Sequence, residues 1–416
     1  MRKLIGKLAL TAVAVALIAL PLAATAGETP LQAASEDGVL VWKSTDNAFK
    51  WWIDARVYAD VATYMDDGWT DGDDEEQDLI GGTFMRRARF AVKTILWTDW
   101  YAEVDMDFAE ETTALKDAYV AYRGLFGGRG HVRVGNFRQP FGLEENFTSR
   151  NLLFMERSTG TEPFVVGRRM GIEVARWDPD WRVAASVYGA DVSDFAGEKD
   201  DDETVSFAAR VNYTPIHTEE SVLLVGAAAT LRKTDWDAGE VRFDVRPETY
   251  VADTKFTDTD DIEDVDKYNV LGGELAYVNK RFYAQGEYMT AGVTRLEGLE
   301  DLSFGGGYVY AGLFLTDDTH PYDYQNAEFG RVIPRSKKGA WELAARYSTL
   351  DLDDQDIEGG SSSIVTLGLN WYANPNIRVY LNYVMVNNDE TAMGRRDDLP
   401  GDYDFNFLQA RFLAAF

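Results

Sequence analysis

Arginine is the residue type in this chain best suited to chemistry, because it recurs in short clusters beside aromatic residues and glycine. Residues 84–90 read FMRRARF, and the stretch from Gly135 to Arg169 begins GNFRQPFGLEENF and is rich in arginine and phenylalanine. A guanidinium group stays ionised and presents a rigid fork of donors that matches phosphate oxygens. A file of such groups can pass an anion along without holding it in a deep trap.

Catalytic chemistry has little support in the sequence. The histidines are His131, His217 and His320, and their spacing matches neither a metal site nor a Ser-His-Asp triad. The aspartates near 258–266 and 351–356 lack the glycine and final glutamate of a calcium loop, so we interpret them as solvated loops, with weak divalent binding as the alternative. We expect no enzyme activity, no metal and no cofactor, and the lack of cysteine excludes disulfides.

The first 26 residues predict an export signal. Lys3 and Lys7 precede an apolar run from Leu8 to Leu22, and small residues lead up to Ala26, after which we expect cleavage. The apolar run is too short for a spanning helix, and no later segment has the roughly 18 consecutive apolar residues that one needs. The processed chain would carry 38 basic and 70 acidic residues. That acidic balance argues against a nucleic acid partner.

From Trp51 the apolar pattern has a period of two, which is typical of strands. Ile53, Val57 and Val61 share one face, while Asp54 and Arg56 share the other. The same alternation returns at 83–97 and at 100–108, where Glu103, Asp105 and Asp107 oppose apolar residues. In a membrane barrel the apolar face meets lipid and the charged face lines water.

We predict an all-β protein: a transmembrane antiparallel β-barrel of about 16 strands with inward-folded constriction loops. Residues 27–49 are interpreted as a periplasmic lead-in and residues 50–416 as the barrel. The remaining strands are expected near 114–124, 131–139, 168–177, 181–190, 204–214, 221–233, 267–279, 281–292, 304–315, 340–350, 363–373, 376–387 and 403–416.

The connections predict which segments enter the barrel. Short turns alternate with long acidic loops, as in bacterial outer-membrane barrels. The stretch 135–169 is too long for a hairpin loop, so we expect it to fold into the lumen and narrow the pore. The last strand ends on the aromatic residue Phe416, which resembles an outer-membrane sorting signature. Counting back from that periplasmic end, residues 316–339 form an unusually long periplasmic segment that also folds inward.

Tryptophans cluster near the ends of the expected strands. Trp51, Trp97, Trp100, Trp181 and Trp371 are examples. Membrane barrels place such residues at the two lipid–water interfaces. The alternative is a path along which sugars stack.

Several motifs together resemble the phosphate-selective porin family of the porin O and P type. They are FMRRARF at 84–90, DAY at 117–119, GNFRQPFGLEE at 135–145 running into FMERS at 154–158, FGR at 329–331 and WELAARYS at 341–348. The resemblance covers essentially the whole processed chain. It implies a homotrimeric barrel of sixteen strands, constricted by inward-folded third and fifth loops and by a long periplasmic turn.

The resemblance also implies a pathway of basic residues for anions. Carried onto this chain, its members in the wall are Arg56, Arg86, Arg87 and Arg89. The third loop contributes Arg138 and Arg157, and the fifth loop contributes Arg242 and Arg246. Members in the periplasmic segment include Arg331 and Lys337. We expect Arg138 and Arg157 to matter more for conduction than Arg411, which is expected on the last strand, away from the constriction formed by 135–169.

Other features of the sequence favour a weaker anion preference. Asp244 lies between Arg242 and Arg246, and the carboxylates of 103–107 neighbour the basic residues of 87–93, so cross-strand pairing is expected to neutralise part of the wall. The basic residues then serve as a structural charge network. Acidic runs at 71–76 and 200–203 would repel anions at the mouth.

The sequence therefore predicts a passive channel in the outer membrane of a Gram-negative bacterium. Its cargo is small anions, with phosphate or polyphosphate first. The alternative is a general or cation-tolerant diffusion porin on the same scaffold. The expected partners are outer-membrane lipid, lipopolysaccharide and two further copies of the chain.

Overall fold

The computed structural model describes residues 30–65, 68–70, 76–77, 79–109, 113–189, 191–192, 205–233, 239–296 and 298–416. The predicted signal peptide with its cleavage after Ala26 lies outside these ranges, as do residues 71–75 and 200–203 of the acidic runs. None of the helices in the described part of the chain has the length and apolar character needed to cross a membrane.

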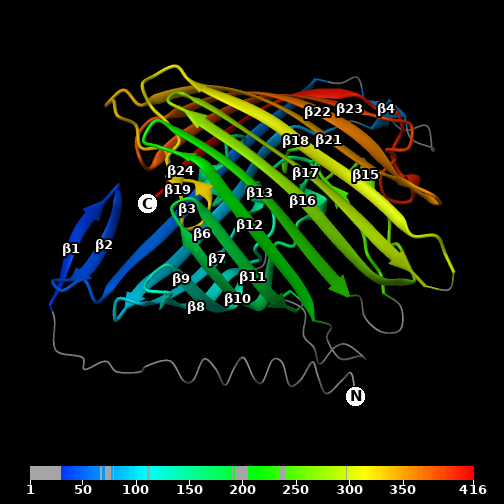
Figure 1. Cartoon of the computed structure of the whole chain (residues 1–416). Helices are drawn as coiled ribbons and strands as arrows, with labels where there is room; N and C mark the ends of the chain where they lie inside the picture. The colour runs from blue at the N-terminus through cyan, green and yellow to red at the C-terminus, as the bar shows by residue number, and fades with distance from the viewer. Residues whose placement is uncertain are drawn as a thin grey trace, which may run out of the picture.

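Sixteen antiparallel strands close into one barrel, which confirms the predicted fold class (Figure 1). The last strand pairs with the first, with Arg411 opposite Asp60, so the wall has no free edge along this seam. The strands are β3 (Lys50–Met65), β6 (Gly82–Leu96), β7 (Trp100–Asp107), β8 (Ala114–Leu125), β9 (Gly130–Arg138), β10 (Arg168–Asp178), β11 (Trp181–Tyr188), β12 (Ser206–His217), β13 (Ser221–Lys233), β16 (Val265–Asn279), β17 (Phe282–Arg295), β18 (Leu302–Phe314), β21 (Ala340–Asp354), β22 (Ile357–Tyr372), β23 (Ile377–Asn388) and β24 (Phe405–Ala415).

Short elements fill the connections. They are β4 (Trp69–Thr70), β5 (Glu76–Gln77), α2 (Leu143–Asn146), η1 (Ser149–Asn151), η2 (Glu162–Phe164), β14 (Asp244–Val245), β15 (Thr257–Asp258), β19 (Tyr322–Asp323), β20 (Glu328–Phe329) and η4 (Arg395–Asp397). We call the end of the barrel that carries the short connections the turn end. The opposite end is the loop end.

A hairpin precedes the barrel within the predicted lead-in. Its strands β1 (Leu31–Glu36) and β2 (Val39–Ser44) pair with each other, and β2 continues the sheet beside β3. The rings of Trp42 and Trp51 stack there with centroids 4.1 Å apart. The hairpin extends from the turn end, beside the C-terminus (Figure 1).

Side chains alternate across the wall as the period of two predicts. On β3 the inward residues Asp54 and Arg56 are buried, while the outward residues Val57 and Val61 are 38% and 47% exposed. On β7 the inward residues Glu103 and Asp105 are buried in the same way. The charged interior and apolar exterior are those of a membrane barrel.

A β-bulge breaks this alternation on β6. Opposite β3 the pairing passes from Tyr58 and Arg87 to Ala59 and Met85, which leaves Arg86 as the extra residue. Arg87 is buried, and Arg86 binds a carboxylate inside the barrel. The bulge therefore brings two consecutive arginines to the interior.

Three connecting segments lie inside the barrel. The inner segment, residues 139–167, runs between β9 and β10. The loop-end hairpin, residues 239–264 with β14 and β15, lies against it, as the 5.6 Å between the ring centroids of Phe164 and Phe243 shows. The turn-end hairpin, residues 316–339 with β19 and β20, enters from the other end and accepts a hydrogen bond from Asn151 at Phe329.

The inner segment is fixed by apolar contacts on one side of the barrel. Phe141 and Phe164 pack with residues of β16, β17 and β18, and Leu143, Phe147 and Phe154 form a second cluster with β13, β17 and β18. Each fully buried side chain of this size contributes roughly 1.5–3 kcal/mol. The opposite side, along β3 and β6 to β11, is lined by charged groups instead.

Candidate functional site

A cavity of about 300 Å³ lies between the charged side of the wall, the inner segment and the turn-end hairpin. The hydroxyl and amide groups of Tyr119, Asn146, Thr148 and Asn326 contribute to its lining. Four carboxylates line it, from Glu103, Asp105, Asp117 and Glu328. Cationic groups are more numerous and come from Arg56, Lys93, Arg133, Arg138, Arg150, Arg168 and Arg182.

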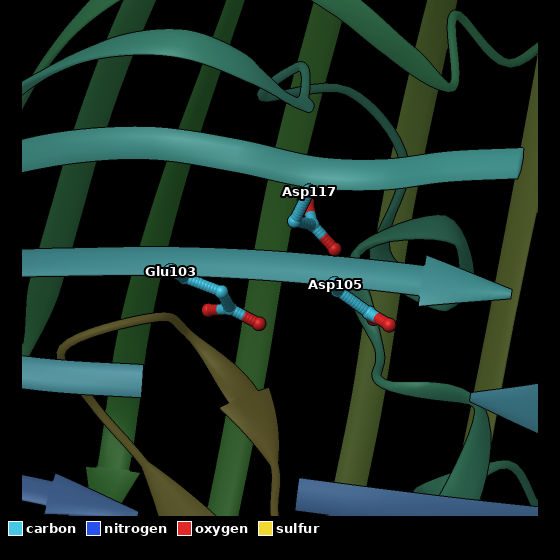
Figure 2. Close-up of side chains that lie close together, drawn as sticks. All are labelled: Glu103, Asp105 and Asp117. Atoms are coloured by element: carbon cyan, nitrogen blue, oxygen red, sulfur yellow. The ribbon is translucent and has the colours of Figure 1, made fainter. Parts of the chain in front are cut away.

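Three of the carboxylates form a group on β7 and β8. Oxygen atoms of Glu103, Asp105 and Asp117 lie within 4.8 Å of one another, and Figure 2 shows these side chains on two neighbouring strands. Asp105 and Asp117 are direct cross-strand partners. Like charges placed so closely repel each other unless cations compensate them.

Each member of this acidic group has a cation beside it. The ammonium group of Lys93 lies 3.1 Å from Glu103, and Arg168 lies 2.7 Å from Asp117. Arg89 lies 3.7 Å from Asp105. The predicted cross-strand pairing is confirmed here, and the group is better described as part of an ion-pair network than as a metal site.

The predicted wall residues Arg56 and Arg89 both take part in such pairs. Arg56 donates two hydrogen bonds to Asp54, of 2.9 and 2.8 Å, and a third of 2.9 Å to Thr148 of the inner segment. Arg89 donates a hydrogen bond of 2.9 Å to Asp107. Arg56 also lines the cavity, so its paired guanidinium still faces the open space.

Arg86 and Arg87 differ although they are neighbours. Arg86 forms a bidentate pair with Glu156 of the inner segment, with bonds of 2.8 and 3.0 Å. Arg87 is 5% exposed, and within the described residues it makes neither a hydrogen bond nor an ion pair. Its guanidinium carbon lies 5.9 Å from the centre of the Tyr58 ring. Arg87 is thus a buried cation whose donors are free.

Arg138 and Arg157 share one carboxylate. Their Nε atoms lie 3.1 and 3.0 Å from the two oxygens of Glu145. Arg157 also donates to the carbonyl groups of Glu144, Glu145 and Phe147, at 3.2, 3.1 and 3.2 Å. Only Arg138 lines the cavity, so Arg157 holds the inner segment together while Arg138 faces the open space.

In the loop-end hairpin the basic residues are paired. Arg242 donates to Asp258 at 2.7 Å, and Arg246 binds Asp253. Asp244, the acidic residue between them, binds Lys255. None of these residues lines the cavity.

Arg331 and Lys337 lie in the turn-end hairpin but away from the cavity. Arg331 donates hydrogen bonds of 2.8 Å to the carbonyl groups of Pro375 and Asp37, which ties the hairpin to a turn and to the N-terminal strands. Lys337 is exposed.

Arg411 was expected to lie away from the inner segment, and this prediction is wrong. Its guanidinium donates to both oxygens of Asp60, at 2.7 and 2.6 Å, and also contacts Glu156 and the carbonyl of Met155. Burial opposes the ionisation of Glu156, but the charges of Arg86 and Arg411 outweigh it and hold the pKa of this carboxyl below its usual range. The inner segment is therefore anchored to the wall by ion pairs as well as by apolar contacts.

Five cations of the cavity were not among the predicted residues. They are Lys93, Arg133, Arg150, Arg168 and Arg182. Strand alternation could have identified Arg133, because it shares the inward face of β9 with His131. Both residues bind Glu173, at 2.8 and 2.7 Å. Arg150 belongs to an irregular segment, where periodicity gives no direction for a side chain.

A closed barrel with a charged interior, an apolar exterior and segments folded inside defines an outer-membrane channel of the porin class. The profile described as phosphate-selective porin O and P matches residues 57–416. The chain belongs to this family.

Two relatives match along most of the chain. A protein of Caulobacter vibrioides described as uncharacterized is 28% identical over 413 residues, covering 93% of this chain and 79% of its own. Porin O of Pseudomonas aeruginosa is 25% identical over 399 residues, covering 87% of this chain and 88% of its own.

Among solved structures, the anion-selective porin of Comamonas acidovorans has a similar fold, with a TM-score of 0.56 at 12% sequence identity. The match covers 88% of this chain and all of that one. At this identity the likeness concerns the fold alone.

Proposed function

We propose that the protein is a passive outer-membrane channel for small anions, with phosphate or polyphosphate as the preferred cargo. The observation that carries this proposal is Arg87, a buried guanidinium that makes neither a hydrogen bond nor an ion pair within the described residues. A buried charge is costly unless something compensates it. An anion that arrives and leaves supplies that compensation transiently.

The composition of the cavity lining also supports a preference for anions. Cations outnumber carboxylates in its lining, seven to four. Low-dielectric walls strengthen the field of this excess charge. The paired arginines Arg56, Arg138 and Arg168 face the cavity with their geometry already fixed, so an anion pays little to order them. In this proposal the ions pass through the cavity, and the inner segment forms the constriction.

The proposed pathway uses only some of the basic residues implied by the family resemblance. Arg56 and Arg138 would contact ions in the cavity, together with Lys93, Arg133, Arg150, Arg168 and Arg182. Arg87 does not line this cavity, so its proposed contact with ions rests on its lack of a hydrogen-bond or ion-pair partner. The residues Arg86, Arg89, Arg157, Arg242, Arg246 and Arg331 have protein partners that favour a positioning role.

A planar-bilayer measurement tests the proposal. We expect the reversal potential in a potassium chloride gradient to have the sign of an anion-preferring channel. Phosphate is expected to block the chloride current at millimolar or lower concentration. A cation-preferring sign would refute the anion selectivity, and chloride current that ignores phosphate would refute the phosphate preference.

A general or cation-tolerant porin is the second candidate, and the ion pairing inside the barrel favours it. Glu103, Asp105 and Asp117 supply negative groups that a cation could follow along the cavity. This candidate predicts a reversal potential near zero or of the cationic sign, with no block by phosphate.

We also propose that the channel is a homotrimer set in outer-membrane lipid, with its loop end facing lipopolysaccharide. The apolar outer face, exemplified by Val57, Val61 and Leu275, suits lipid or a second copy of the barrel. Chemical cross-linking in detergent, followed by mass measurement, would show a species of three chains. A uniform monomer would contradict the assembly.

A further inference from the structure

Glu328 is the one carboxylate of the cavity lining that has no partner within the described residues. It lies on β20 of the turn-end hairpin, where Asp323 is its cross-strand partner. The three other carboxylates of the lining, those of Glu103, Asp105 and Asp117, each have a cation within 3.7 Å. The Glu328 carboxylate thus faces the cavity uncompensated.

Four charged groups face Glu328 from the surrounding elements. Asp323 lies on its own hairpin, Arg182 on β11, Arg210 on β12 and Arg138 at the end of β9. Burial and the negative charge of Asp323 favour the neutral form, and the three arginines favour the ionised form. The first pair of effects prevails and raises the pKa of Glu328 to about 7.

The arginines fail to compensate Glu328 because each is engaged elsewhere. Arg210 forms a bidentate pair with Glu274, with bonds of 2.8 and 2.9 Å. Arg182 donates to the carbonyl of Gln325 at 3.0 Å, and Arg138 lies 3.1 Å from Glu145. Their field reaches Glu328, but their hydrogen-bond donors are directed to other groups.

We propose that Glu328 is a selectivity residue, whose carboxylate opposes anions in the cavity and whose protonation makes the cavity more positive and strengthens its preference for anions. The inference rests on the proposed function in one respect, that ions pass through this cavity. When Glu328 is ionised, the cavity lining carries an uncompensated carboxylate that repels anions. When Glu328 is neutral, the excess of cationic groups along the pathway grows by one charge.

Among the described residues outside the wall strands, one other carboxyl is a candidate for the same pH range. Glu162 of the inner segment accepts a hydrogen bond of 3.1 Å from Tyr250. Burial and the charge of Glu156 raise the pKa of Glu162 to about 7. Glu162 does not line the cavity, so its charge should affect permeation less.

The test measures reversal potentials in a potassium chloride gradient at pH 8 and at pH 6. The proteins are the wild type, Glu328→Gln, Glu162→Gln and the control Glu219→Gln, which changes an exposed carboxylate at the turn end. Glutamine imitates the neutral acid in size and charge. For one charge at roughly 10 Å in an aqueous pore, we expect anion and cation permeability each to change about two-fold in opposite directions, so their ratio should change about four-fold.

In the wild type and the Glu219→Gln variant, this ratio should rise as the pH falls from 8 to 6. The Glu328→Gln variant should have, at both pH values, a ratio close to that of the wild type at pH 6. It should therefore lose most of the pH dependence. A full pH response in Glu328→Gln would overturn the proposal, as would loss of the response in Glu162→Gln alone. The currents themselves show that each variant has folded into a barrel.

The two proposals can fail separately. A wild-type channel that prefers cations at both pH values would refute the proposed anion selectivity. The role of Glu328 would still stand if its glutamine variant shifted the reversal potential at pH 8 in the anion direction. An anion-preferring channel with no difference between Glu328→Gln and wild type would refute only the role of Glu328.

Discussion

The two sides of the barrel interior use inward-facing residues in opposite ways. Along β3 and β6 to β11 the wall presents arginines, a lysine and carboxylates to an open cavity. Along β13, β16, β17, β18 and β21 it presents aromatic and aliphatic side chains that pack against the inner segment and the loop-end hairpin. Buried charged groups on the same strands, such as Glu287 and Arg346, form hydrogen bonds with the inner segment. The same alternation of inward and outward residues thus builds a hydrated wall on one side and a dry core on the other.

This difference shows how a wide barrel acquires a narrow passage. A sixteen-stranded wall alone encloses a wide aqueous lumen. The dry side removes much of that space by holding the inner segment against β18 and β21. The charged groups of the hydrated side face the part of the lumen that remains open. Changes on the dry side should therefore alter pore size and stability, and changes on the hydrated side should alter ion preference.

The largest effect on conductance is expected at Gly160, where the inner segment touches the dry wall. A Cβ atom at Gly160 would clash with the carbonyl oxygens of Gly307 and Thr349. Because these are backbone atoms of the wall, the inner segment must move. We expect Gly160→Val to cost at least about 1–3 kcal/mol and to raise the single-channel conductance.

The matched control for Gly160 is Gly273, where a Cβ atom would meet nothing within 4 Å. Gly273→Val should leave the conductance unchanged. Heat-induced unfolding in detergent and single-channel recording measure both variants. Equal conductance for Gly160→Val and wild type would show that the inner segment does not limit the pore.

The next effect is expected at Glu156, which joins the two sides. Replacing it with glutamine leaves Arg86 and Arg411 without their shared carboxylate, and breaking such a buried pair costs about 3–5 kcal/mol. Because the folded protein lowers the pKa of Glu156, its ionisation stabilises the fold above the ordinary pKa of a glutamate. This contribution is lost as the pH falls below that value through the folded-state pKa.

Unfolding temperatures measured between pH 7 and pH 3 would check the role of Glu156. The wild type should lose stability with acid more steeply than Glu156→Gln, since the variant lacks this titration. An exposed change, Glu219→Gln, should retain the wild-type profile. Parallel curves for wild type and Glu156→Gln would contradict the anchoring role.

The wall could be predicted from the sequence because it depends on a local signal. Period-two alternation separates Asp54 and Arg56 from Val57 and Val61 without knowledge of any partner strand. The bulge at Arg86 has no such signal, and strict alternation would turn Arg86 toward lipid. Only the family resemblance placed Arg86 beside Arg87 in the lumen.

The partners of each charge could not be predicted, since they arise from contacts between distant segments. The length of 135–169 suggested that it turns inward, but its irregular backbone gave no direction for Arg157. In the structure Arg157 donates to carbonyl groups of its own segment. Arg411 lies 255 positions from Glu156, yet the two are in contact. Such pairs depend on the closed barrel.

On the hydrated side, Arg87 should affect anion binding more than Arg157 does. Arg87→Gln removes a free cation from the proposed pathway. Because hydrogen bonds to charged groups are worth about 1.5–3 kcal/mol, the concentration of phosphate that blocks chloride current should rise about ten-fold or more. Arg157→Gln should reduce thermal stability and leave that concentration closer to the wild-type value. The reverse order would mean that Arg157 contacts the ions.

The smallest effect is expected at Lys337, which the family resemblance places in the pathway but which is exposed at the turn end. Solvent screens an exposed charge, and the Debye length is about 10 Å at 0.1 M salt. Lys337→Gln should therefore leave the permeability ratio unchanged at this salt concentration and shift it slightly at ten-fold lower salt. Arg331→Gln provides the comparison, because it should lower the unfolding temperature by releasing the carbonyl groups of Pro375 and Asp37. A large effect of Lys337→Gln at 0.1 M salt would mean that the pathway extends along the turn-end hairpin beyond Glu328.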